Sequence, residues 1–242
     1  MSVHWPIIKR LLASPARPAV VDDQRRWKAV ELLLGSLHIA AAVAPRNESK
    51  TLGLLLPTSG LFPMAALAGW ALGRTVVPLN YLLKPEELQF VIDDCGCDTV
   101  VAVKPMLDFL GFRPRNVRVQ LLENIAFKSF PDFRWPAMPP DDELAVLLYT
   151  SGTSGKPKGV MLSHANLESN VRQCQRWIDI SSRNVFLGVL PQFHSFGLTG
   201  LTLLPLMCGC KVVYTARFAP HKIIQLIREH RPSVFVAIPS MY

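Results

Sequence analysis

The sequence predicts an α/β fold in which helices flank mostly parallel β-sheets, and three observations lead to that fold class. The chain has 242 residues, of which 50% are hydrophobic and 18% charged, a composition typical of a globular protein with a sizeable core. Its short apolar runs lack the alternation of a strand with one wet face, which indicates parallel strands covered on both faces. Helical patterns separate several of these runs, as in folds that alternate strands and helices.

The predicted strands are short runs rich in aliphatic and β-branched side chains. They are Leu52–Leu56, Thr75–Leu79, Asp98–Val103, Val117–Leu122, Leu144–Tyr149, Val185–Leu190, Lys211–Tyr214 and Ser233–Ile238. The signal is weakest over Lys104–Asp142, where FKSFPDFRWPAMPPDDE is rich in proline and aromatic residues and has no period. We expect this region to be a long surface connection that leads into the strand Leu144–Tyr149.

Three helices have recognisable ends. In KPEELQFVIDDCG, Pro85 marks the first turn and Gly96 the end of the helix. In SHANLESNVRQCQRWI, Ser163 is the expected N-cap of a helix with an apolar face. The third helix, APHKIIQLIREHRP, is predicted between Pro220 and Pro232.

The charge of the chain limits its partners. The formal charge of +8 comes from scattered basic residues. Such a surface is solvated, or it attracts an anionic substrate such as a nucleotide, or it makes peripheral contact with an acidic membrane face. No basic stripe with interleaved aromatic residues is present, so we expect no nucleic-acid partner.

The N-terminus and the cysteines indicate a cytoplasmic protein. MSVHWPIIKRLLASPARP lacks the charge, apolar segment and cleavage site of a signal peptide, and apolar runs such as Leu201–Cys210 are too short to cross a bilayer. The chain has 5 cysteines, an odd number, and disulfides rarely persist in the cytosol. Two CGC triplets, Cys95–Cys97 and Cys208–Cys210, lack the usual spacing of zinc ligands, so we expect buried packing and no structural metal.

The most informative segment, TSGTSGKPKG, follows the strand Leu144–Tyr149 and precedes the predicted helix. Glycines allow close approach to a ligand and positive φ, successive backbone N–H groups can bind an anion, and hydroxyls and lysines add donors. The predicted nucleotide-binding residues are Thr150, Ser151, Gly152, Thr153, Ser154, Gly155, Lys158 and Gly159. The loop is not a Walker loop, because Thr150 stands where the first glycine belongs and Pro157 follows the lysine.

The two lysines of this loop are predicted to differ in role. Lys156 precedes Pro157, which favours an extended backbone and leaves the side chain free in solvent. Lys158 is expected near the start of the following helix, where the helix dipole also favours an anion. We therefore assign the phosphate contact to Lys158.

The stretch YTSGTSGKPKGVMLSH resembles the signature of the AMP-forming adenylate synthetases, which include acyl-CoA synthetases, luciferases and the adenylation domains of peptide synthetases. Flanking segments extend the resemblance: ALAGWALGRTVVPLNYLLKPEELQFVIDDCGC upstream and LPQFHSFGLTGLTLLPLMCGCKVV downstream. VDDQRRWKAVELLLGSLHIAAAV resembles a degraded N-terminal motif, in which the usual Thr-Tyr pair is replaced around Arg26-Trp27. Together these segments cover nearly all of residues 20–242.

The resemblance implies a layered N-terminal domain and two-step chemistry. A carboxylic acid would react with ATP to give acyl-AMP and pyrophosphate, and a thiol of CoA or of carrier-protein phosphopantetheine would then take the acyl group. By this analogy Thr150 would place its hydroxyl near Mg²⁺, and Lys158 would neutralise the leaving pyrophosphate. His194, in PQFHSFG, would lie beside the acyl carboxylate, although a lone histidine is more often a satisfied core or turn residue.

The resemblance also implies missing parts. The family's Tyr-Gly-x-Thr-Glu segment, its ribose-binding Asp and its mobile C-terminal domain with a catalytic Lys have no counterpart here. We expect residues 1–242 to be an N-terminal AMP-binding fragment that is incomplete as an enzyme and that associates through apolar surface exposed near Ser233–Ile238.

The substrate and the role of the fragment stay open at this point. FHSFGLTGLTLLPL looks most like long-chain acyl-CoA or acyl-carrier-protein synthetases, although its apolar residues suit a core helix as well as an acyl tunnel. The alternative function is a non-catalytic module from a truncated gene that binds a nucleotide or a partner.

Overall fold

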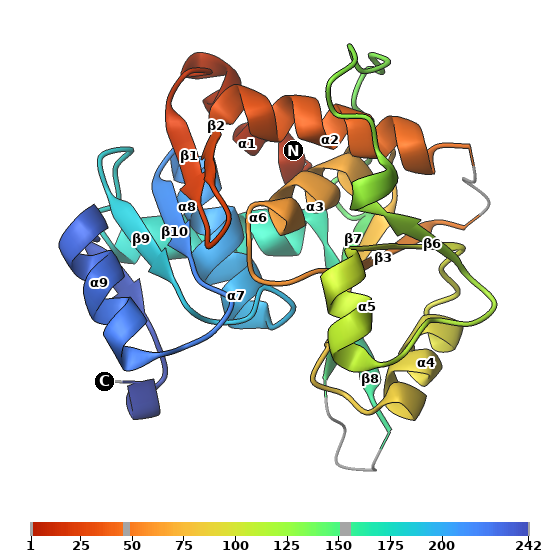
Figure 1. The fold of residues 1–242 in the computed structure, drawn as a ribbon. Helices are drawn as coiled ribbons and strands as arrows, with labels where there is room; N and C mark the ends of the chain where they lie inside the picture. Colours follow the sequence, from red (N-terminus) through yellow and green to blue (C-terminus); the bar gives the residue numbers. More distant parts are fainter. Residues whose placement is uncertain (1, 46–48, 151–155, 242) are drawn as a thin grey trace. The chain divides into compact units, whose positions relative to one another are not determined.

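The computed structural model describes residues 2–45, 49–150 and 156–241, and the chain divides into two compact units (Figure 1). Unit 1 comprises residues 1–2, 34–56 and 64–166, and unit 2 comprises residues 3–33, 57–63 and 167–242. Each unit contains one sheet flanked by helices, so the predicted α/β class is confirmed.

The sheet of unit 1 has 6 strands in the order β6-β5-β3-β4-β7-β8. The strands are β3 (Thr51–Leu55), β4 (Thr75–Pro78), β5 (Thr99–Ala102), β6 (Arg118–Leu121), β7 (Leu144–Thr150) and β8 (Lys158–Ser163). All neighbours pair in parallel except β7 and β8, which form an antiparallel hairpin. The side chains of the central strands β3, β4 and β5 are almost entirely buried, which explains their unbroken apolar sequences.

One helix of unit 1 precedes its first strand, and the others connect its strands. They are α2 (Ala29–Val43) and α3 (Leu61–Ala71), which both begin in unit 2, then α4 (Pro85–Asp94), α5 (Lys104–Leu110) and the 3₁₀ turn η1 (Leu122–Asn124). Helix α4 begins as predicted at Pro85, and the Glu87 carboxylate accepts a hydrogen bond from the Lys84 N–H at 3.0 Å. Trp70 of α3 is buried and donates its indole N–H to the Ala145 carbonyl at 2.9 Å.

A buried ion pair joins two strand ends of unit 1. The side chain of Arg74 is 1% exposed and pairs with the carboxylate of Asp98. The same guanidinium donates to the Thr51 carbonyl at 2.6 Å. Burial alone would raise the pKa of Asp98, but hydrogen bonds from the Ser49 amide and from Arg74 hold it below its usual value.

The sheet of unit 2 has 5 strands in the order β11-β9-β10-β1-β2. The strands are β1 (Pro18–Val21), β2 (Arg26–Lys28), β9 (Val185–Gly188), β10 (Lys211–Tyr214) and β11 (Val234–Val236). The helical elements are α1 (His4–Ala13), α6 (His164–Trp177), α7 (Ser195–Leu198), the π-helical turn η2 (Thr199–Leu203), α8 (Leu204–Cys208), α9 (Pro220–His230) and the 3₁₀ turn η3 (Pro239–Met241). Only the β1–β2 pair is antiparallel in this sheet.

The predicted strands all occur within a few residues of their expected bounds. Strand β11 lies at the sheet edge and its side chains are half-buried, which agrees with the expected exposure near Ser233–Ile238, while association through this surface stays a prediction. Lys104–Asp142 is not one connection, since it contains α5 and β6, whereas residues 125–143 form no helix or strand. There Phe130 is 97% exposed and Trp135 80%. No helix among the described residues is both long and apolar enough to span a membrane.

The cysteines of both CGC triplets are buried, as expected. Cys95, Cys97, Cys208 and Cys210 are free thiols in the cores of their units. Within the described ranges no three histidine, cysteine or acidic side chains gather as metal ligands would.

Candidate functional site

The glycine-rich segment joins the two strands of the β7–β8 hairpin in unit 1. Thr150, the last residue of β7, pairs with Lys158, the first residue of β8, and both are exposed. The structure therefore brings two predicted site residues together, a hydroxyl opposite an ammonium. The predicted residues Ser151, Gly152, Thr153, Ser154 and Gly155 lie outside the described residues.

The expected strand–loop–helix arrangement is wrong. Lys158 begins a strand, and helix α6 begins only at His164, so the helix dipole does not act at Lys158. The N-cap prediction itself is confirmed, because Ser163 Oγ accepts the Asn166 N–H at 3.2 Å and the Asn166 side chain accepts the Ser163 N–H at 3.0 Å. The sequence therefore located the start of α6 correctly, but the residues before it, Lys158–Ser163, form a strand and not a loop.

Lys156 does not extend freely into solvent as predicted. Its ammonium lies 5.6 Å from the centroid of the Phe90 ring on α4, within the range of a cation–π contact. Proline at position 157 leaves Lys156 in irregular backbone before β8, where its side chain reaches this ring. Of the two lysine ammonium groups, only that of Lys156 makes such a contact. The ammonium of Lys158 forms no ion pair or cation–π contact with the described residues.

Gly159 lies close to side chains of β7. The described glycines with positive φ are Gly73, Gly96, Gly111 and Gly209, so the prediction of a left-handed backbone at Gly159 is wrong. A Cβ at position 159 would lie 2.9 Å from Leu147 Cδ1 and 3.3 Å from Tyr149 Cζ. The side chains of β7 therefore occupy the space where a residue larger than glycine would project.

Tyr149 fixes the end of β7 beside the predicted phosphate-binding segment. Its hydroxyl donates a hydrogen bond to the Asp94 carboxylate at the end of α4. Burial, and then the hydrogen bond to this carboxylate, raise the pKa of Tyr149 far above its usual value, so the phenol stays protonated. This contact, which sequence reasoning missed, positions Thr150.

His194 lies in unit 2 at the N-cap of α7. The residue is exposed, and its ring centroid lies 4.4 Å from that of the buried Phe193. Partial burial lowers the pKa of His194, so the imidazole is neutral near pH 7. A neutral ring can both donate and accept a hydrogen bond from a substrate.

A buried polar network supports the backbone around His194, and sequence reasoning missed it as well. The Gln192 amide is 1% exposed, accepts the Ser59 N–H at 3.0 Å and donates to the Thr202 hydroxyl at 3.2 Å. Gly197 is also required here, because a Cβ would lie 2.0 Å from the Pro191 carbonyl oxygen. The signal that could have revealed the network is the polar Gln192 within the otherwise apolar VLPQF.

The apolar residues after His194 belong to the core of unit 2. They lie on α7, η2 and α8, and Leu198, Leu201 and Leu203 are fully buried. The core-helix interpretation of this segment is therefore sufficient, and these side chains give no separate argument for an acyl tunnel. The π-helical turn is a local irregularity of a kind that is frequent at functional sites.

The chain belongs to the AMP-binding enzyme family, whose model matches residues 9–242. Human mitochondrial malonate–CoA ligase ACSF3 is 28% identical over 258 residues, which cover 98% of this chain and 44% of that protein. Long-chain-fatty-acid–CoA ligase of Bacillus subtilis is 36% identical over 109 residues, which cover 44% of this chain and 20% of that protein.

A solved structure agrees with the fold. The o-succinylbenzoate CoA synthetase of Bacillus subtilis, in complex with its acyl-adenylate intermediate OSB-AMP, has a TM-score of 0.85 and 25% identity, with 98% of this chain and 62% of that chain covered. This chain resembles the N-terminal part of longer acyl-CoA ligases, and it spans about half the length of the curated relatives that it matches.

Proposed function

We propose that this chain carries the ATP-binding half-site of an acid–thiol ligase that converts a carboxylic acid to acyl-AMP, releases pyrophosphate, and transfers the acyl group to CoA or to carrier-protein phosphopantetheine. The observation that carries the proposal is the β7–β8 hairpin, where Thr150 and Lys158 face each other across the ends of the glycine-rich segment. The family match over residues 9–242 supports it.

Lys158 is proposed to contact the phosphates that leave as pyrophosphate. Charge builds on the leaving group during attack at the α-phosphate, and an ammonium placed at that position stabilises the charge without reorganisation. Lys158 is exposed at the start of a strand, so its ammonium can reach a ligand above the hairpin.

Thr150 is proposed to hold the magnesium ion that accompanies ATP. Among the residues that the structure describes, no cluster of three protein ligands exists, so the phosphate oxygens and water would complete the shell, as is usual for Mg²⁺. The exposed hydroxyl of Thr150 at the end of β7 fits that limited role.

His194 is proposed to lie beside the acyl carboxylate. Its neutral, exposed imidazole can donate one hydrogen bond to a carboxylate oxygen, and the Gln192 network below it restrains the backbone. We assign a fatty acid as the first substrate to test, because a long-chain-fatty-acid–CoA ligase is among the relatives. The malonate and o-succinylbenzoate ligases are reasons to test short and aromatic acids as well.

The test is acid-dependent ATP–pyrophosphate exchange by the protein expressed from its complete reading frame. A panel should contain long-chain and medium-chain fatty acids, malonate and aromatic carboxylates. Exchange that requires one of these acids supports the proposal. ATP binding without exchange for any acid would instead support a non-catalytic nucleotide-binding module and reject the proposed reaction.

A further inference from the structure

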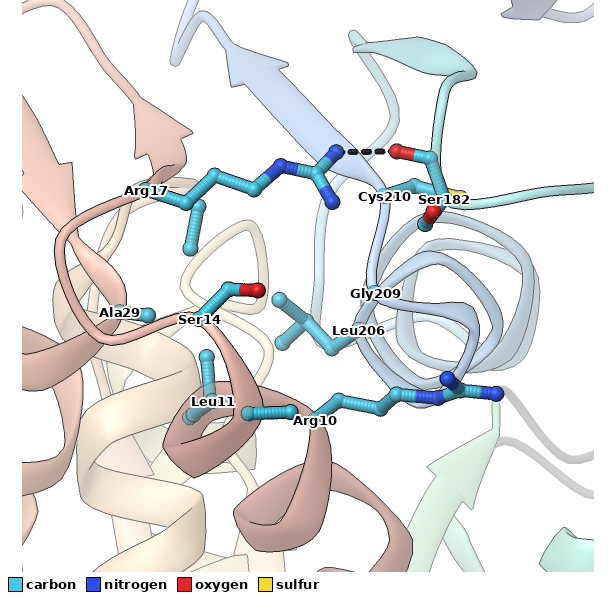
Figure 2. A pocket seen from close by; sticks show the side chains of 11 residues that line it. Arg10, Leu11, Ser14, Arg17, Ala29, Ser182, Leu206, Gly209 and Cys210 are labelled. Atoms are coloured by element: carbon cyan, nitrogen blue, oxygen red, sulfur yellow. Dashed lines mark hydrogen bonds between the residues drawn. The ribbon is translucent and has the colours of Figure 1, made fainter.

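Unit 2 contains a cavity of about 110 Å³, shown from close by in Figure 2. Helices α1 and α8 and the turn at Ser182 contribute to its walls. Arg17 lies on one side of the cavity and Arg10 on the other, with the Ser14 hydroxyl between them (Figure 2). None of the residues assigned to adenylation lines this cavity.

Each guanidinium group donates a hydrogen bond to one backbone carbonyl. Arg10 Nε donates to the Met207 carbonyl at 3.3 Å, and Arg17 donates to the Ser182 carbonyl. Each contact uses one of the five N–H donors of a guanidinium. In the described part of the chain neither arginine forms an ion pair with a carboxylate. Arg10 is exposed and Arg17 is half-buried, and the two cations, with most of their donors unused, flank one small space.

Most of the neighbouring charges are also positive, although the hydrogen bond with Cys210 and the charge of Arg10 lower the pKa of the Cys208 thiol. Burial lowers the pKa of Lys211, and repulsion from Arg26 and Arg17 lowers it further. Glu229 offsets part of this repulsion, but it is already paired with Arg26 at 3.2 Å. The chain as a whole carries a formal charge of +8. The surroundings of the cavity thus favour an anion.

We propose that this cavity binds a phosphate group, held by Arg10 and Arg17 and by the hydroxyls of Ser14 and Ser182. A phosphate has oxygens in a tetrahedral arrangement and can accept hydrogen bonds from donors on opposite walls, whereas the two coplanar oxygens of a carboxylate face one wall. Guanidinium groups match phosphate oxygens in geometry and charge. The proposal does not depend on the adenylation chemistry.

The carbonyl ends of two helices near the cavity explain only in part why two arginines lie there. The carbonyl ends of α1 and α8 favour cations, but a helix end carries only about half a negative charge. The Ser14 hydroxyl has no hydrogen-bond partner among the described residues. A bound anion would use both the hydroxyls and the remaining guanidinium donors.

The phosphate group has two chemically distinct sources, free inorganic phosphate and a phosphomonoester on an organic molecule. Isothermal titration of the complete protein with inorganic phosphate and with methyl phosphate, at constant ionic strength, separates them. Binding of both ligands identifies a phosphomonoester site, and binding of inorganic phosphate alone identifies a site for the free ion. Binding of neither below about 10 mM would overturn the proposal.

Variants assign any binding to this cavity. Arg10→Gln and Arg17→Gln should each weaken phosphate binding about tenfold or more, because each removes a charge-assisted contact. Arg183→Gln is the matched control, since Arg183 is an exposed arginine beside Ser182 that does not line the cavity. Repeating the titrations in a Lys158→Ala background removes any contribution from the glycine-rich segment. Equal affinity in all these variants would reject the assignment.

One further measurement remains informative if an arginine variant fails to fold. Ser14→Ala removes only a hydroxyl from an exposed position and should weaken binding about two- to tenfold. Unchanged affinity in Ser14→Ala would count against the site.

Discussion

Replacing Lys158 by alanine is the most direct test of the β7–β8 hairpin as a phosphate site. The side chain is exposed and forms no ion pair with a carboxylate in the described part of the chain, so the folded state loses little when it is removed. We expect the free energy of unfolding to change by about 0.5 kcal/mol or less. A larger loss of catalytic rate would then reflect a lost contact with the ligand and not a damaged fold.

The expected size of that effect follows from the contact that is lost. A charge-assisted hydrogen bond contributes about 1.5–3 kcal/mol, and about 1.4 kcal/mol corresponds to a tenfold change in rate. Lys158→Ala should therefore slow pyrophosphate formation by about tenfold to a hundredfold. Lys156→Ala removes a cation–π contact with Phe90, which at an exposed site contributes about 0.5–1 kcal/mol, so we expect a change of about fivefold or less.

The assay is ATP–pyrophosphate exchange with both variants side by side, in the complete protein and with a saturating acid substrate. Circular dichroism and urea unfolding of each variant show whether the fold is intact. If Lys156→Ala is the more damaging change, the roles assigned to the two lysines are wrong even though the family is established. If both variants exchange like the wild type, the hairpin does not hold the leaving phosphates.

Three further changes test the fold that surrounds these sites. Gly197→Ala should destabilise unit 2 by about 2 kcal/mol or more in urea unfolding, because the new methyl group would lie 2.0 Å from the Pro191 carbonyl; wild-type stability would contradict the local geometry. Arg74→Met should destabilise unit 1 by about 3 kcal/mol, since it leaves the partly buried Asp98 carboxylate without its cation. A loss under about 1 kcal/mol would mean that water solvates this carboxylate in place of Arg74. Burial lowers the pKa of His164, so below about pH 6.5 the unfolded chain binds a proton more readily than the folded chain. The free energy of unfolding should therefore fall as the pH drops through that range. His164→Gln should remove part of this pH dependence.

The central strands could be predicted from the sequence because burial on both faces leaves a strong signal. Thr75–Leu79 and Asp98–Val103 are apolar runs with clear ends, and the structure places β4 and β5 there. Strand β2 (Arg26–Lys28) has only 3 residues and is largely exposed, so it has no apolar run to detect. Helix α3 is apolar on all sides and contains Pro63, so it has no helical period to recognise.

The chemistry proposed for the candidate site rests on residue types, whereas its geometry depends on the fold. Glycines, hydroxyls and lysines in TSGTSGKPKG indicate an anion site whatever the backbone does. The position of Lys158 depends on which element follows the loop, and the N-cap signal at Ser163 drew the predicted helix too close. Gly159 was expected to allow a positive φ. The structure instead shows that Leu147 crowds this position, and such crowding arises only in the folded hairpin.

Helix α4 contacts the chain on both sides of residues 151–155. Tyr149 binds the Asp94 carboxylate on one side of the segment, and Lys156 contacts the Phe90 ring on the other. Both partners belong to one helix, whose first turn is fixed by Pro85. If Thr150 and Lys158 hold phosphate as we propose, restraint of their neighbours Tyr149 and Lys156 would reduce the entropy that is lost on binding. On this proposal an ammonium and a hydroxyl at strand ends would replace the helix N-terminus that phosphate sites commonly use.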